Sequence, residues 1–125
     1  MTGPDSHEQG GLPRAYLRPC LLILLAEGAC HGYELLEQVR RLGVRGTEAG
    51  SLYRVLRVME REGQVTSWWE TSRTGPARRT YVLSDSGRAE LKASVAALRD
   101  VQRLLTSLLD RHDARAGRTG SDRPT

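Results

Sequence analysis

The spacing of hydrophobic residues changes along the chain and separates helical regions from one alternating stretch. From residue 15 to residue 63 the apolar residues recur every three or four positions, which is the spacing of one helix face. A glycine closes each of three such runs. We therefore predict three short helices, at about 15–27, 32–42 and 47–63.

The predicted third helix, Thr47–Gly63, has an apolar side and a basic side, and we expect Thr47 to be its N-cap. The apolar side holds Leu52, Val55, Leu56 and Met59, and the opposite side holds Gly50, Arg54, Arg57 and Arg61. Such a helix suits the DNA major groove, although an ordinary amphipathic surface helix has the same pattern. The second and third helices meet across a brief turn, which is helix-turn-helix geometry.

After Gly63 the hydrophobic period becomes alternating, which predicts a strand at 65–71 and a second strand at 80–83. The polar loop between them contains a Gly-Pro break, so the pair reads as a β-hairpin. Its tip and flanks carry Arg73, Arg78 and Arg79, with no acidic residue between Thr71 and Ser84. A basic hairpin directly after a groove helix is a wing that follows the DNA backbone; the alternative is a solvated charged loop.

A long last helix is predicted from Ser84, its N-cap, to about Arg111. Its apolar residues repeat with a period close to seven, which is typical of a coiled-coil seam. These residues are Leu91, Val95, Leu98, Val101, Leu105 and Leu108. A domain this small has nothing left to cover the seam, so we expect the same helix of a second copy to pack against it.

These elements predict a mainly α fold with a small β-hairpin: a winged helix-turn-helix followed by a dimerisation helix. We expect a flexible arm at 1–14, the DNA-binding domain at 15–83, the dimerisation helix at 84–112 and a disordered tail at 113–125.

Charge and composition favour nucleic acid as a partner. The formal net charge is +4 and the pI about 9.6, and Lys92 is the single lysine, so arginine supplies nearly all the basic charge. Arginine suits bidentate contacts to phosphate and guanine, although a coding bias of the genome would give the same enrichment. We see neither a signal peptide nor an apolar run long enough to span a bilayer, and we expect a cytoplasmic protein.

Four residues of the predicted third helix are the candidates for groove contacts: Ser51, Tyr53, Arg54 and Arg57. The chain contains no asparagine, the usual bidentate partner of adenine, so an arginine contacting guanine is the most available direct readout. For Tyr53, packing in the core is the alternative. We expect Arg73, Arg78 and Arg79 to position the protein on phosphates rather than to read bases.

Other chemistry has weaker support. Cys20 and Cys30 are most simply small buried residues, and with His31 they lack the clustered spacing of a zinc site, although a metal or thiol sensor stays open. Trp68 and Trp69 are adjacent on a strand and face opposite ways, so one should pack on the core. The other is left for solvent or for a flat ligand. No enzyme motif is present, and we expect neither catalysis, a cofactor nor a bound metal.

The sequence resembles the PadR-like winged-helix transcriptional regulators. The resemblance lies in an HGYEL turn, in the GSLY start of the predicted third helix and in the segment GPARRTYVLSDSG, within Leu21–Val39, Gly50–Glu70 and Gly75–Leu91. It is closest to the compact branch of the family, with a short C-terminal helix.

This resemblance implies a homodimeric repressor that binds double-stranded DNA at an inverted repeat and is often released by a small ligand. It also implies a dimer made largely by the last helix. The rival hypothesis is a winged-helix module that binds protein and has no specific DNA site, because a fold does not fix a function. Affinity for duplex DNA with a steep salt dependence separates the two.

Overall fold

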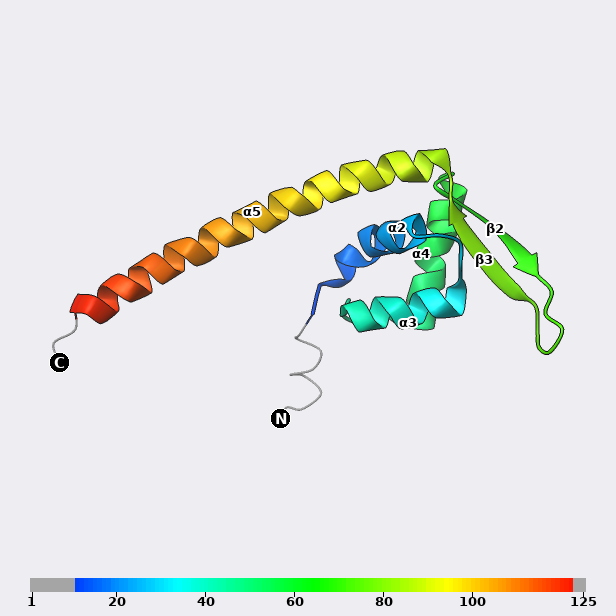
Figure 1. The fold of residues 1–125 in the computed structure, drawn as a ribbon, viewed down its shortest axis with the longest axis horizontal. Coiled ribbons are helices and arrows are strands. Elements are labelled where there is room, and N and C mark those ends of the chain that lie inside the picture. The colour runs from blue at the N-terminus through cyan, green and yellow to red at the C-terminus, as the bar shows by residue number, and fades with distance from the viewer. Residues whose placement is uncertain (1–10, 123–125) are drawn as a thin grey trace. The chain divides into compact units, whose positions relative to one another are not determined.

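The computed structural model describes residues 11–122 of the chain and divides into two compact units, which meet between Lys92 and Ala93. The elements follow the order η1, α2, β1, α3, α4, β2, β3 and α5 (Figure 1). Their bounds are η1 Arg14–Tyr16, a 3-10 turn, then α2 Leu17–Ala26, β1 Cys30–His31, α3 Gly32–Leu42, α4 Ala49–Arg61, β2 Val65–Glu70, β3 Arg78–Leu83 and α5 Asp85–Asp122.

The three predicted helices are confirmed, and α3 has the predicted bounds. Gly43 ends α3 in the left-handed region, at φ +89°, where a residue without a Cβ is favoured. The predicted N-cap of α4 is wrong. The Thr47 hydroxyl donates to the carbonyl of Val44 at 3.0 Å, inside the preceding turn, and Glu48 occupies the N-cap position without a side-chain capping bond.

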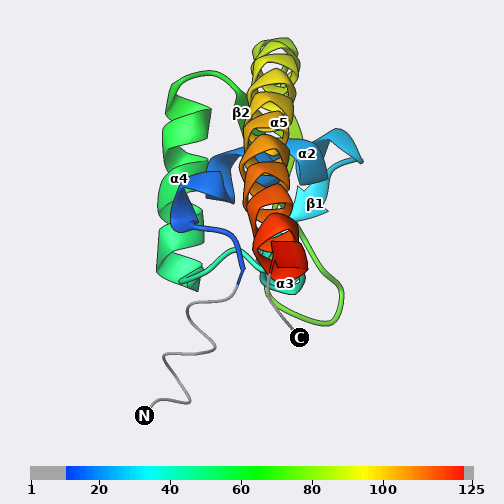
Figure 2. The same ribbon diagram turned by 90° about the vertical axis from the view of Figure 1, so that its left-hand side faces the viewer.

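The sheet has three antiparallel strands in the order β1-β3-β2, one more than predicted. The hairpin pairs Val65 with Leu83 at one end and Glu70 with Arg78 at the other, so β3 starts two residues before its predicted start. The additional strand β1 pairs its two residues with Tyr81 and Thr80 of β3. Figure 2 shows α4 leading through a tight turn into β2, which ties the hairpin to the C-terminal end of that helix.

The core of the first unit lies between α2, α3, α4 and the sheet, and is built mainly from leucines. The prediction that one tryptophan packs on this core is wrong, because Trp68 is 43% exposed and Trp69 62% exposed. Burial along β2 ends early: Val65 is buried and Ser67 half-buried, and the strand then runs beyond the helices. Both indoles lie in that outer part of the hairpin.

Part of the predicted N-terminal arm is ordered. The backbone N–H of Leu12 donates to Gly43 at 2.7 Å, and its carbonyl accepts from Arg45 at 2.7 Å, so this segment lies along the turn between α3 and α4. Gly11 passes so close that an added Cβ would fall 2.1 Å from the Gly43 oxygen. Residues 1–10 of the predicted arm lie outside the described residues.

Helix α5 begins as predicted, with the Ser84 hydroxyl accepting from the backbone N–H of Gly87 at 3.0 Å. Gly87 is required there, because an added Cβ would lie 2.1 Å from the carbonyl oxygen of Gln64. The helix continues to Asp122, so the predicted disordered tail is wrong for residues 113–122, and 123–125 lie outside the described residues. Ala114, Arg115 and Ala116 favour helix by propensity without any apolar period.

Candidate nucleic-acid interface

Helix α4 presents an arginine face opposite its buried face. Leu52 and Leu56 are 0% exposed, whereas Arg54 and Arg57 are both exposed on the other side. The C-terminal end of α4 is fastened to α2 by Arg18, which forms an ion pair with Glu62 and donates to Gln64 at 2.7 Å. These contacts anchor one end of the helix, while the guanidinium groups of Arg54 and Arg57 remain exposed.

The structure places Ser51 differently from the other groove candidates. It is 7% exposed, and its hydroxyl accepts a hydrogen bond from the Arg14 guanidinium. Arg14 itself is exposed. Sequence reasoning missed Arg14, because the two partners are 37 positions apart and no spacing rule connects them. At this end of α4 the charged group that faces solvent is thus Arg14, with Ser51 as its support.

Tyr53 is 36% exposed and lies against the first turn of α3. A Cβ added to Gly32 would fall 2.7 Å from Cε1 of Tyr53 and 2.9 Å from its hydroxyl oxygen. Gly32 therefore makes room for the phenol. The ring half-packs at the edge of the apolar face and leaves its hydroxyl near the surface.

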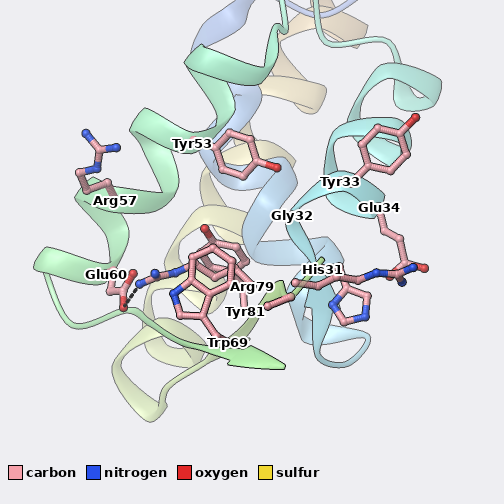
Figure 3. Close-up of a pocket in the computed structure, with 12 residues that line it drawn as sticks. His31, Gly32, Tyr33, Glu34, Tyr53, Arg57, Glu60, Trp69, Arg79 and Tyr81 are labelled. Carbon is pink, nitrogen blue, oxygen red and sulfur yellow. Dashed lines mark ion pairs between the residues drawn. The ribbon is translucent and has the colours of Figure 1, made fainter. Parts of the chain in front are cut away.

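A pocket of about 630 Å³ lies between α4, the start of α3 and the hairpin. Its aromatic residues are Tyr33, Tyr53, Trp69 and Tyr81, and Figure 3 shows the rings of Trp69 and Tyr81 at the sheet side, below Tyr53. Burial raises the pKa of Tyr81, so that phenol keeps its proton. Arg57, Arg78 and Arg79 also line the pocket, together with the carboxylates of Glu34 and Glu60, so three arginines and two acidic side chains lie next to the arginine face of α4.

The three predicted wing arginines are not equivalent. Arg73 and Arg78 are exposed, and among the side chains described neither has a carboxylate at ion-pair distance. Arg79 is half-buried, donates from Nε to Ser67 at 2.9 Å and lies 3.6 Å from Glu60. The arrangement leaves Arg73 and Arg78 free for phosphate and engages Arg79 inside the protein.

The two cysteines are free thiols in environments that disfavour the thiolate. Burial raises the pKa of Cys20. Burial, the nearby charge of Glu34 and a hydrogen bond to that carboxylate raise the pKa of Cys30 to about 11. Reactive sensor thiols have lowered pKa values, so this geometry gives a thiol sensor no support. Within residues 11–117 no three His, Cys, Asp or Glu side chains gather as a metal site would require.

The predicted dimerisation residues fall into three groups. Leu91 packs against the core of the first unit. Val95, Leu98 and Val101 are half-buried, while Leu105 and Leu108 are 54% and 64% exposed. The structure adds Leu104 and Leu109, which are 66% and 62% exposed. The uncovered apolar surface of α5 is thus broader than the predicted seam.

In the part of the chain that the structure describes, no helix is both long enough and apolar enough to cross a bilayer.

Comparison with known proteins agrees with this geometry. Residues 21–93, more than half of the chain, match the transcriptional regulator PadR-like family. The probable transcriptional regulator Rv1176c of Mycobacterium tuberculosis is 38% identical over 78 residues, which are 61% of this chain and 41% of that relative. This chain therefore matches less than half the length of that relative.

Solved structures show the same fold. A PadR-like regulator from Bacillus cereus has a TM-score of 0.69 and 26% identity, over 76% of this chain and 92% of that one. A PadR family regulator from Eggerthella lenta has a TM-score of 0.66 and 27% identity, over 77% and 83%. Members of the family are DNA-binding transcriptional regulators and not enzymes. The resemblance is confirmed, and the chain belongs to the PadR-like family of transcriptional regulators.

Proposed function

We propose that the chain is a homodimeric repressor that binds an inverted-repeat operator. The observation that carries the proposal is that exposed arginines of α4 and of the wing border the same pocket, Arg57 from the helix and Arg78 from the hairpin. Arg14 lies at one end of α4, Arg54 and Arg57 lie along it, and Arg78 lines the pocket between this helix and the hairpin.

In this proposal the two parts of the surface act differently on DNA. Helix α4 enters the major groove, where Arg54 is the candidate for a bidentate contact to guanine O6 and N7. Arg57 and Tyr53 contact the groove edge or the adjacent phosphates. Arg73 and Arg78 hold the neighbouring backbone and carry no sequence information. Ser51 contributes through the Arg14 side chain that it orients.

The dimer follows from the uncovered leucines of α5. A second copy of the helix would bury the exposed residues Leu105 and Leu108, together with the half-buried seam that precedes them. The separation of the two α4 helices would then set the spacing of the two half-sites. A small ligand that favours a mismatched separation would release the operator, because it shifts the equilibrium between dimer geometries.

The test is fluorescence anisotropy on the duplex upstream of the protein's own gene, with a scrambled duplex of equal length, at two salt concentrations. We expect tight, salt-sensitive binding that prefers the native duplex. Arg88→Ala is the control for the loss of one positive charge, because it removes an exposed arginine from the first turn of α5, outside α4 and the wing. Absence of binding at low salt would overturn the proposal and favour a protein-binding module. Equal weak binding of both duplexes would contradict an operator at this position.

A further inference from the structure

Arg79 sits in a closed set of contacts that its neighbours in the wing lack. Its Nε donates to the Ser67 hydroxyl at 2.9 Å, and its Nη2 lies 3.6 Å from Oε2 of Glu60. The Ser67 hydroxyl in turn donates to the same Glu60 oxygen at 2.8 Å. Each of the three side chains therefore contacts the other two, and Figure 3 shows the pairing of Glu60 with Arg79.

The three members come from three different elements. Glu60 lies in the last turn of α4, Ser67 in β2 and Arg79 in β3. The face of the Arg79 guanidinium also covers the indole of Trp69, its cross-strand partner, at 5.4 Å from the ring centroid. The cluster thus joins the helix that faces the groove to both strands of the wing.

The cluster lies where the hydrophobic core has ended. Trp69 is 62% exposed, and its neighbours Trp68 and Glu70 in β2 are exposed as well. Beyond this point the ladder between β2 and β3 holds the strands to each other, and β1 contacts the hairpin through its pairing with β3 and through His31, which lies 3.8 Å from Glu70. The Glu60–Ser67–Arg79 cluster links the hairpin directly to α4.

The same geometry argues against a phosphate contact for Arg79. Moving its guanidinium to DNA would separate it from Glu60 and leave that carboxylate without its cationic partner beside the phosphates, where like charges repel. An arginine is suited to the internal role, because its planar fork bonds two acceptors while its face stacks on an aromatic ring.

We propose that Arg79 is a positioning residue that fixes the wing against α4, and that Glu60 is its essential partner. This inference rests on the proposed DNA binding. It changes the role predicted for Arg79 from a phosphate contact to an internal clamp, and it leaves Arg73 and Arg78 as the wing's contacts to the backbone.

Glu60→Ala gives the sharpest test, because two roles for Arg79 predict opposite signs. If Arg79 contacts phosphate, removal of the Glu60 carboxylate frees the guanidinium and removes a negative charge near DNA, so binding tightens. If Arg79 is a clamp, the wing loses its restraint and operator affinity falls, by about tenfold for one lost ordering interaction.

Arg79→Ala and the double variant complete a cycle. If Arg79 is a clamp, Arg79→Ala should lower operator affinity about as much as Glu60→Ala does. The double variant should bind hardly more weakly than either single variant. The salt dependence of binding by Arg79→Ala should have the same slope as that of the wild type. Arg78→Ala is the comparison variant, because Arg78 is assigned to a phosphate contact; the slope of its salt dependence should fall by about one. Arg79→Lys should fail to restore affinity. A reduced slope for Arg79→Ala, together with undiminished binding by Glu60→Ala, would overturn the inference.

A second readout needs no DNA and separates failure of the clamp from failure of the proposed function. In a Trp68→Phe background the fluorescence anisotropy of Trp69 reports the mobility of the wing. Glu60→Ala is the informative variant, because it keeps the Arg79 side chain that stacks on Trp69. We expect the anisotropy to fall in Glu60→Ala and to stay unchanged in Arg78→Ala. If the wild type binds no DNA, the proposed function fails, but this measurement still tests whether Arg79 and Glu60 restrain the wing. Equal anisotropy in all variants would refute that role.

Discussion

The two units of the chain differ in how far the leucines of their amphipathic helices are buried. Leu52 and Leu56, on α4 of the first unit, are 0% exposed. In the second unit Leu105 and Leu108 are 54% and 64% exposed, although they also lie on an amphipathic helix. The first unit covers Leu52 and Leu56 with its own helices and sheet. In the described part of the second unit nothing covers Leu105 and Leu108, and an exposed apolar patch of this kind marks an interaction surface.

The comparison predicts that stability and assembly depend on different leucines. Leu52→Ala should destabilise the first unit by about 2–5 kcal/mol, because it leaves a cavity in a packed core. That loss should be the same at every protein concentration. Leu105→Ala should lower stability only through the dimer, and its effect should therefore vary with concentration. Urea denaturation at several concentrations distinguishes them, and a concentration-independent loss in Leu105→Ala would break the comparison.

The second prediction tests the exposed leucines as the dimer surface. Leu105→Glu with Leu108→Glu should raise the dimer dissociation constant by about a hundredfold or more, since each buried leucine contributes roughly 1.5–3 kcal/mol. Sedimentation velocity measures the shift to monomer. Ser107→Glu is the matched control, because it adds a charge at an exposed polar position of the same helix. A double variant that stays dimeric would place the interface elsewhere.

Within the first unit, sequence periodicity predicted the elements that have long periodic patterns. The bounds of α3 and the cap at Ser84 follow from local rules, because a glycine stop and a hydroxyl cap act within a few residues. Strand β1 could not be found in this way. It has two residues, too few to show alternation, and it forms only because β3 offers an edge to Cys30 and His31.

What the sequence did not predict at the site are contacts between side chains that are distant in sequence. Ser51 looks like a groove residue by its position, but Arg14, from a segment taken as flexible, covers it. Arg79 looks like a free wing cation, but the turn after α4 brings Glu60 beside it. Opposite charges are abundant in the chain, so no sequence rule selects this pair. Exposure of both tryptophans likewise depends on where the helices end against β2.

The third prediction separates recognition from assembly. Arg54→Ala should weaken operator binding by about 1–3 kcal/mol if Arg54 reads a guanine, and it should relax specificity at that base pair. Dimerisation should not change, because Arg54 lies in the first unit and the exposed leucines lie in the second. Anisotropy on operator duplexes substituted at single positions measures this effect. A uniform loss over all duplexes would instead assign Arg54 to phosphate.

The smallest expected effect concerns how tightly the first unit shields its thiols. With the pKa of Cys30 raised from 9.0 to about 11, alkylation of a Cys20→Ser variant should reach its half-maximal rate near pH 11. The raised pKa of Cys30 also makes the stability of the folded state depend on pH. The folded state holds the proton more tightly than the unfolded chain, so the contribution is complete below pH 9 and is lost as the pH rises toward 11. Half-maximal alkylation near pH 9 in the folded protein would contradict both the burial of Cys30 in the first unit and its contact with Glu34.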